Sequence, residues 1–222
     1  MQKETINSFF QKVYLWMFFG LLISALTAYS VFWFPALFAF IILTPLFWVL
    51  VILELGIVIV LSMLLTKISA TTAKVLFILY SFLTGLTLSV IFFAYTLESI
   101  FAVFFIVAVM FLLLSLYGYF TKRDLSRLGP ILFVGLIGII IAAVVNMFLK
   151  SSQFSLIISI IGVVIFTALV IYDTQVIKKF FALEGKNKEV LSKLAIFGAL
   201  KLYLDFINLF LFILRLFGKR RG

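Results

Sequence analysis

Two aspartates lie in stretches that are otherwise apolar enough to cross a membrane. Asp173 lies in FTALVIYDTQVIKK, residues 166–179, and Asp205 lies in GALKLYLDFINLFLFILRLFG, residues 198–218. An ionisable side chain at the centre of a bilayer costs about 2.5–3.5 kcal/mol on insertion scales. A chain that keeps two such groups is expected to use them, so Asp173 and Asp205 are the first candidates for a functional site.

Two carboxyls that touch at low dielectric share a proton, because ionising both places like charges side by side. In the shared-proton state a short hydrogen bond ties the two helices, and in the doubly ionised state the carboxylates repel. Asp173 and Asp205 are therefore predicted to form a pH sensor and gate. The alternative is two separate ion pairs, Asp173 with Lys178 or Lys179 and Asp205 with Lys201 one turn away.

The same stretch carries a wider polar face. Lys201, Asp205, Asn208 and Arg215 follow at steps of four, three and seven, which places them on one side of a helix. Such a face is typical of the wall of a water-filled path or of a buried central helix. Ca²⁺ prefers six to eight oxygen ligands, so Asp173 and Asp205, with Asn208 and water, would bind it weakly and transiently.

A third intramembrane acid, Glu54, falls about halfway through another apolar run, LFWVLVILELGIVIV. A lone acid at this depth needs a cavity, a partner or a proton. Two interpretations stay open: Glu54 lines the same pathway as the aspartates, or it makes a structural hydrogen bond to another helix.

The composition places the chain among polytopic membrane proteins. Of its 222 residues, 66% are hydrophobic and only 12% are charged, which is more apolar surface than a soluble domain of this size can bury. The net charge of +10 sits between apolar runs, so the expected partners of the basic residues are anionic lipid headgroups and not nucleic acid. The absence of Cys and His excludes disulfides and the usual zinc or iron ligands. We therefore expect no cofactor.

Turn signals and charge clusters divide the chain into seven stretches long enough to span a bilayer. We place these spans at 13–34, 37–65, 73–96, 99–120, 129–149, 154–177 and 198–217. They form one all-α domain over residues 13–217, between an N-terminal tail over 1–12 and a basic C-terminal tail over 218–222. Pro45 lies inside the second span and is predicted to kink it.

Small residues four apart predict close helix packing at three places. They are Gly20, Ser24 and Ala28 in the first span, Ser81, Gly85 and Ser89 in the third, and Gly138 and Ala142 in the fifth.

The distribution of basic residues predicts a multi-pass inner membrane protein with a cytoplasmic N-terminus, because most of the 18 lysines and arginines then face the cytoplasm. The basic tail, Lys219 to Arg221, argues the other way and would suit a last segment that dips in and returns.

The depth of the two aspartates depends on where the last span begins. Asp173 precedes Lys178 by five residues, or about 7 Å of helix. A span that began at Val190 would bury Asp205 about 22 Å deep, whereas a span that began near Gly198 would place it about 7–10 Å deep. We therefore predict an interfacial segment over 189–197 and a span from Gly198.

Four blocks resemble the bacterial branch of the Bax inhibitor family, the transmembrane Bax inhibitor motif proteins. They are SLYGYFTKRDLS (115–126), GLIGIIIAAVVNMF (135–148), IYDTQ (171–175) and LYLDFINLFLFILRLFG (202–218). The resemblance extends over residues 10–218 and implies seven helices with the last one central. It also implies a pH-sensitive calcium leak channel linked to stress tolerance, whose paired aspartates match Asp173 and Asp205. Lys201 departs from the small polar residue expected there and is predicted to modulate the pair.

Two other functions compete with a cation leak. An intramembrane aspartyl protease also places an aspartate after a tyrosine, as in Tyr172-Asp173, but the glycines expected before the second aspartate are missing at Asp205. We therefore expect no enzymatic activity. A regulatory protein that acts through membrane-protein partners, such as a membrane protease, stays open. The expected permeant species are Ca²⁺ and protons.

Overall fold

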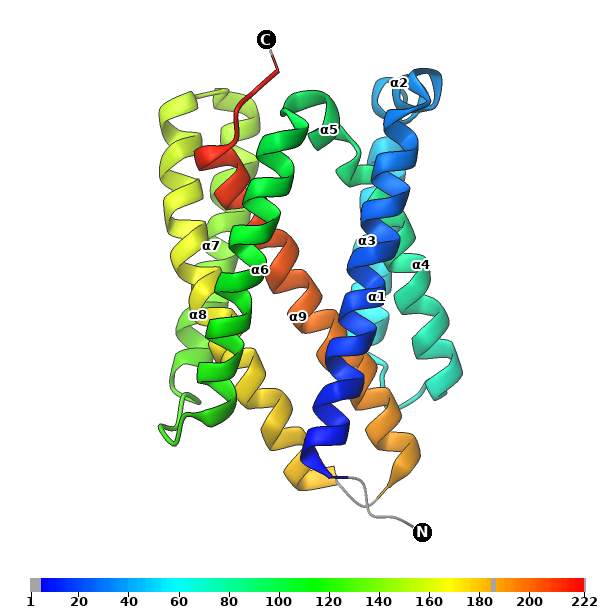
Figure 1. Ribbon diagram of the computed structural model, residues 1–222, viewed down its shortest axis with the longest axis vertical. Coiled ribbons are helices and arrows are strands. Elements are labelled where there is room, and N and C mark those ends of the chain that lie inside the picture. Colours follow the sequence, from blue (N-terminus) through cyan, green and yellow to red (C-terminus); the bar gives the residue numbers. More distant parts are fainter. Residues whose placement is uncertain (1–4, 185–186, 222) are drawn as a thin grey trace. The chain divides into compact units, whose positions relative to one another are not determined.

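The computed structural model describes residues 5–184 and 187–221, and these residues form helices without any strand (Figure 1). The helices are α1 (Ile6–Phe32), α2 (Pro35–Leu43), α3 (Leu46–Met63), α4 (Ala70–Leu88), α5 (Val90–Ala94), α6 (Leu97–Phe120), α7 (Leu128–Leu149), α8 (Ser152–Glu184) and α9 (Lys188–Phe217). Seven helical segments are long and apolar enough to span a membrane, with α4 and α5 counted as one and α2 left out. This confirms the prediction of an all-α protein with seven spans.

Local sequence explains where several helices begin. Thr5, Ser69 and Thr96 precede α1, α4 and α6, and each side chain accepts a hydrogen bond from a backbone N–H in the first helical turn. These N-caps satisfy donors that have no partner within the helix. The first helix begins at Ile6, inside the stretch assigned to the N-terminal tail. Residues 1–4 of that tail and residue 222 of the C-terminal tail lie outside the described residues.

The prediction of one kinked second helix over 37–65 was wrong, because the chain breaks there into α2 and α3. Thr44 has extended backbone angles, φ −107° and ψ 168°, and Pro45 is the N-cap residue of α3. A proline disfavours helical angles in the residue before it and supplies no N–H to the preceding turn. The Thr44 hydroxyl closes the break by accepting from the N–H of Leu46 and donating to the carbonyl of Phe40.

The last span has no helix break at Gly198, because α9 runs without interruption from Lys188 to Phe217. The position of residues 189–197 at the membrane interface, and with it the depth of Asp205, stays a prediction. This stretch is anchored from its start: Leu191 and Ile196 are buried, and the Lys193 amine donates to the carbonyl of Ile68 at 3.2 Å. Gly198 does not end the helix, because packed neighbours outweigh the small helical preference lost at one glycine.

The described residues group into two compact units. The first contains α1 to α5, residues 179–203 and Arg221; the second contains α6, α7, residues 152–178 of α8 and residues 204–220. The last helix contributes to both units and is the most buried span: 67% of its most apolar window is buried, against 50% or less in the other six. This burial is what a central last helix requires.

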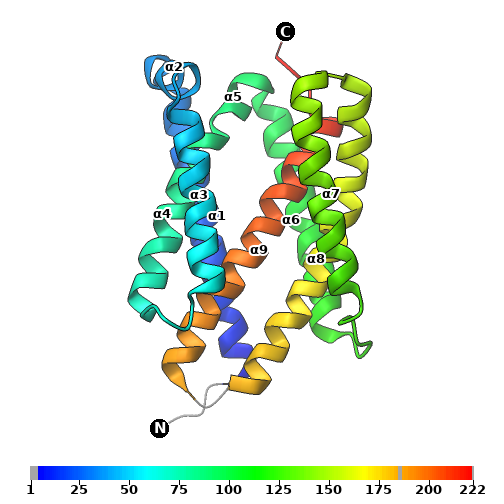
Figure 2. The ribbon, with the colours of Figure 1, turned by 180° about the vertical axis from the view of Figure 1, so that it is seen from behind.

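In the first unit, α1 packs along α4, and Figures 1 and 2 show the two helices side by side from opposite directions. Small residues allow this contact. A Cβ at Gly85 would meet Thr27 Cβ at 2.5 Å, and a Cβ at Gly20 would meet the ring of Phe77 at 2.7 Å. The small-residue prediction is thus confirmed for the first and third spans. It was wrong for the fifth, because a Cβ at Gly138 would meet nothing within 4 Å.

In the second unit, α8 is the helix against which the others pack. A Cβ at Gly118 of α6 would meet the carbonyl oxygen of Ile171 at 2.5 Å, and one at Gly135 of α7 would meet Ile165 at 2.8 Å. From the other side, Phe212 of α9 covers Gly162 and contacts the ring of Phe166 at a centroid distance of 5.7 Å. These contacts set the rotation of α8 and hence the direction of its polar residues.

Candidate functional site

Asp173 lies on α8 beside its contact with α6, and only 3% of its surface is exposed. The next residue, Thr174, is fully buried, and its hydroxyl lies 3.0 Å from the Ser115 hydroxyl on α6. The Thr174 hydroxyl also donates to the carbonyl of Val170 at 2.7 Å. Gly118 brings the backbones of α6 and α8 close together at this height, so Asp173 lies between two residues of α8, Ile171 and Thr174, that pack tightly against α6.

Asp205 lies on the part of α9 that belongs to the same unit, and 4% of its surface is exposed. The next residue, Phe206, packs edge-on against two rings of α6, Phe104 at a centroid distance of 5.3 Å and Phe111 at 5.6 Å. Phe111 and Ser115 are one helical turn apart on α6. The residues that follow Asp173 and Asp205 therefore contact neighbouring turns of the same helix.

The other predicted residues of α9 differ in exposure from Asp205. Lys201 is half-buried, with its amine 5.9 Å from the centroid of Phe197 one turn earlier. The half-buried Asn208 donates from its amide to the carbonyl of Leu204 at 2.8 Å, and Arg215 is exposed. The four polar residues thus lie on one helical face, with Asp205 buried, Lys201 and Asn208 half-buried on either side of it, and Arg215 exposed. Their roles in a pathway stay predictions.

Glu54 belongs to the first unit and is bound to α4. Its carboxylate accepts hydrogen bonds from the Thr84 hydroxyl at 3.3 Å and from the Thr87 hydroxyl at 3.0 Å. These contacts match the second interpretation of Glu54, a hydrogen bond to another helix. A role in the ion pathway stays a prediction.

Sequence reasoning missed Gln175, which holds the connection between α6 and α7. Its side-chain oxygen accepts from the N–H of Leu125 at 2.9 Å, and its amide donates to the carbonyl of Arg123 at 2.8 Å. One turn away, the Lys178 amine donates to the carbonyl of Tyr119 at 2.8 Å. The only sequence feature that could have indicated Gln175 is its place at the end of the block IYDTQ, directly after Asp173 and Thr174.

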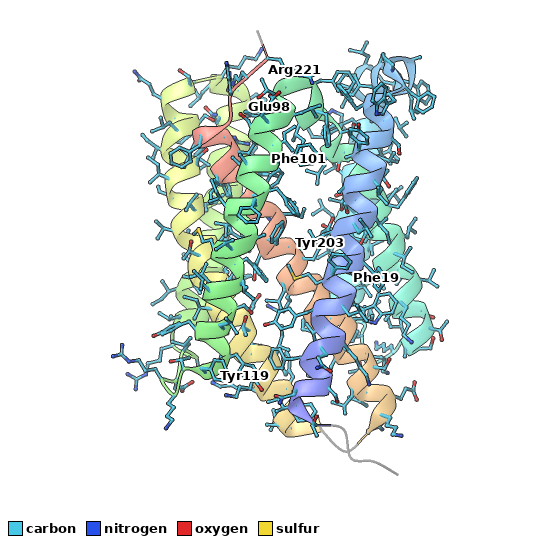
Figure 3. All side chains as sticks on the ribbon, in the orientation of Figure 1. Phe19, Glu98, Phe101, Tyr119, Tyr203 and Arg221 are labelled. Carbon is cyan, nitrogen blue, oxygen red and sulfur yellow. The ribbon has the colours of Figure 1, made fainter. Side chains whose placement is uncertain are left out.

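A buried hydroxyl cluster in the first unit was missed as well. The Tyr203 hydroxyl lies 2.6 Å from the Ser24 hydroxyl of α1, and Figure 3 shows Tyr203 on α9. Serine, threonine and tyrosine are common in membrane helices, so their spacing carries no comparable signal.

The described residues contain no cluster of three or more His, Cys, Asp or Glu side chains that could hold a metal ion. Asp173 and Asp205 are two carboxyls in an apolar unit. Two carboxyls alone supply too few oxygen ligands for a permanent Ca²⁺ site, because Ca²⁺ takes six to eight. The roles of Asp173 and Asp205 as a proton sensor and gate stay predictions.

The chain is similar in sequence to one known family over nearly its whole length. The family described as "Inhibitor of apoptosis-promoting Bax1" matches residues 6–222. The chain belongs to the Bax inhibitor family. This confirms the family resemblance found in the sequence and, with the seven apolar helices, makes the chain a membrane protein.

Three bacterial relatives show how far the similarity extends. Inner membrane protein YbhL of Escherichia coli strain K12 is 50% identical over 128 residues, covering 57% of this chain and 55% of the relative. An uncharacterized protein of Rickettsia prowazekii is 52% identical over 127 residues, covering 57% and 53%, and one of Borreliella burgdorferi is 51% identical over 128 residues, covering 58% and 55%. The matched part of the chain spans a little over half the length of these curated relatives.

Proposed function

We propose that this Bax inhibitor family protein is a pH-sensitive leak channel for Ca²⁺ or related cations in the inner membrane, gated by Asp173 and Asp205. The observation that carries the proposal is the burial of both carboxyls in one apolar unit, at 3% and 4% exposure. Their neighbours Thr174 and Phe206 contact adjacent turns of α6, which supports a similar height for the two groups. The inner membrane location rests on the name of the YbhL relative.

The gate follows from the charge on the pair. When Asp173 and Asp205 share one proton, a hydrogen bond holds α8 and α9 together and closes the path. When pH rises and the second proton leaves, two carboxylates repel at low dielectric and the contact opens. The opened carboxylates then offer oxygen ligands to a passing cation. Flux should therefore increase as pH rises.

Other predicted residues would act around this pair. Lys201, one turn before Asp205, would favour the ionised carboxylate and so shift opening toward lower pH. Asn208 and Arg215 would line the path further along α9 on the same helical face. The N-terminus would face the cytoplasm.

The experiment is a Ca²⁺ flux measurement on purified protein in liposomes that enclose a Ca²⁺ indicator, repeated from acidic to mildly alkaline pH. Wild-type protein should pass Ca²⁺ faster as pH rises, and Asp173→Asn or Asp205→Asn should flatten this response. Asp124→Asn removes an acid from an exposed loop of the same unit and is the matched control, which should keep the response. An unchanged pH response in both dyad variants would refute the gate. Absence of flux at every pH would refute the channel and favour the regulatory alternative.

A further inference from the structure

The connection between α6 and α7, residues 121–127, carries three exposed cations, Lys122, Arg123 and Arg127. Its single acid, Asp124, accepts hydrogen bonds from Ser126, at 3.2 Å from the backbone N–H and at 2.8 Å from the hydroxyl. Among the described residues, none of the three cations forms an ion pair. The net positive charge of the connection is therefore available to a ligand from outside the chain.

The ends of the two helices place these cations at the depth of lipid headgroups. Phe120, the last residue of α6, is 70% exposed, and Ile131, in the first turn of α7, is 67% exposed. Both helices are long and apolar enough to span a membrane, so their exposed apolar side chains face lipid chains. Cations that adjoin such a surface lie among the lipid phosphates. Figure 3 shows nitrogen-tipped side chains of the connection pointing away from α6 and α7, near the labelled Tyr119.

Gln175 of α8 holds the backbone of the connection in one shape. Its buried side chain accepts from the N–H of Leu125 at 2.9 Å and donates to the carbonyl of Arg123 at 2.8 Å. The N–H of Arg123 donates to the Thr121 hydroxyl at 3.3 Å, so both backbone polar groups of Arg123 are bound. A connection that is fixed in this way loses less conformational entropy when its side chains bind a ligand.

The chemistry of the three cations matches a phosphate group. An arginine binds phosphate oxygens through two parallel N–H donors, and a lysine adds a compact positive charge. An acidic protein segment would offer carboxylates, but the phosphates of anionic lipids are already concentrated at this depth. The exposed apolar surface at Phe120 and Ile131 also gives the acyl chains of a lipid a place to pack. These two features favour a lipid over a protein.

We propose that the 121–127 connection is a binding site for an anionic phospholipid, whose phosphate is held by Lys122, Arg123 and Arg127. The acyl chains lie along the exposed apolar surface of α6 and α7. Gln175 is a positioning residue: it is buried and fixes the backbone that carries the cations. The site lies in the second unit, and its function does not require ion flux.

The test measures the gain in unfolding temperature Tm that phosphatidylglycerol gives the full protein in neutral detergent micelles, relative to phosphatidylcholine. At about ten times its dissociation constant, a lipid bound to one site should raise Tm by roughly 3–6 °C. A triple variant with Lys122→Gln, Arg123→Gln and Arg127→Gln should lose most of this gain, because only the charges that bind the phosphate are removed.

Two controls separate a defined site from general attraction to anionic micelles. A triple variant with Lys67→Gln, Lys150→Gln and Lys188→Gln removes the same charge at exposed positions elsewhere and should keep the gain. Gln175→Ala keeps every charge but releases the connection, so it should reduce the gain, whereas Gln153→Ala, at an exposed site on α8, should not. The two triple variants change exposed side chains alone, so they decide the proposal even if Gln175→Ala fails to fold.

Inorganic phosphate in place of lipid distinguishes the two possible sources of the phosphate group. It should give no comparable gain in Tm, because it cannot also cover the apolar surface at Phe120 and Ile131. An equal gain with inorganic phosphate would overturn the assignment to a lipid. An undiminished gain in the variant of the connection, or an equal loss in the control triple variant, would overturn the site itself. None of these measurements depends on ion flux, so the outcome is separate from that of the proposed channel.

Discussion

Substituting Gly118 by alanine tests how closely α8 must approach α6 beside Asp173. An added Cβ would lie 2.5 Å from the carbonyl oxygen of Ile171, 3.0 Å from Thr174 Cβ and 3.1 Å from Ile171 Cα. Two of these three atoms belong to the backbone, so no flexible side chain can move aside. The carbonyl oxygen of Ile171 would have to move to about 3.4 Å from the added Cβ to reach ordinary van der Waals contact, which requires α8 to shift by roughly 0.9 Å.

The cost of this substitution follows from the packing. Overpacking of a close contact costs about 1–3 kcal/mol, and replacing a helical glycine by alanine returns about 0.5–1 kcal/mol. The net destabilisation lies between about 0 and 2.5 kcal/mol, and the mid-range values give about 1.3 kcal/mol. For a chain of this length the mid-range value lowers Tm by roughly 3–5 °C, measured by intrinsic fluorescence during heating of the detergent-solubilised protein.

Gly138 supplies the matched control in the same unit, since a Cβ there would meet nothing within 4 Å. Gly138→Ala should keep Tm or raise it by a few degrees, because only the helical preference changes. Gly118→Ala should thus lower Tm, whereas Gly138→Ala should not. Equal shifts in Gly118→Ala and Gly138→Ala would refute the close contact between α6 and α8.

Two further predictions concern polar side chains that hold the connections between helices. Gln175→Ala removes both hydrogen bonds to the 121–127 connection and should lower the free energy of unfolding by about 1–3 kcal/mol. The loosened connection should be cleaved faster by trypsin after Lys122 and Arg123. Gln153→Ala, at an exposed site on α8, is the control and should leave the cleavage rate unchanged. Lys193→Met removes a charged donor to the carbonyl of Ile68 and should lower Tm by about 2–4 °C. Lys188→Met, at the exposed start of α9, is the control and should leave Tm unchanged.

The helical part of the fold was largely predictable, because a span needs a long apolar run and each run stands out between turns and charges. Helix boundaries were harder to predict, because the apolar pattern is the same whether or not a helix is interrupted. At Pro45 the prediction was a kink within one helix, but the extended backbone of Thr44 separates α2 from α3. Residues 189–197 continue α9 without a break at Gly198, and the contacts of Leu191 and Lys193 hold this stretch in place.

The candidate site was predictable only in part. Asp173, Asp205 and Glu54 could be identified from sequence, since a carboxyl inside an apolar span is costly and therefore rare. Ser24, Thr84 and Tyr203 could not, because each of them is unremarkable on its own helix. Ser24 and Tyr203 meet only when α1 and α9 bring residues 179 positions apart to 2.6 Å.

The sequence by itself determined the family, the membrane environment and the identity of the three acids within apolar spans, because these depend on composition, on spacing and on the cost of charge in lipid. The tertiary structure decided which hydroxyls surround Glu54, which turns of α6 hold the neighbours of Asp173 and Asp205, and where α3 and α9 begin. Hydrogen bonds and close packing act between residues far apart in the chain, and their distances are set only when the helices are packed together.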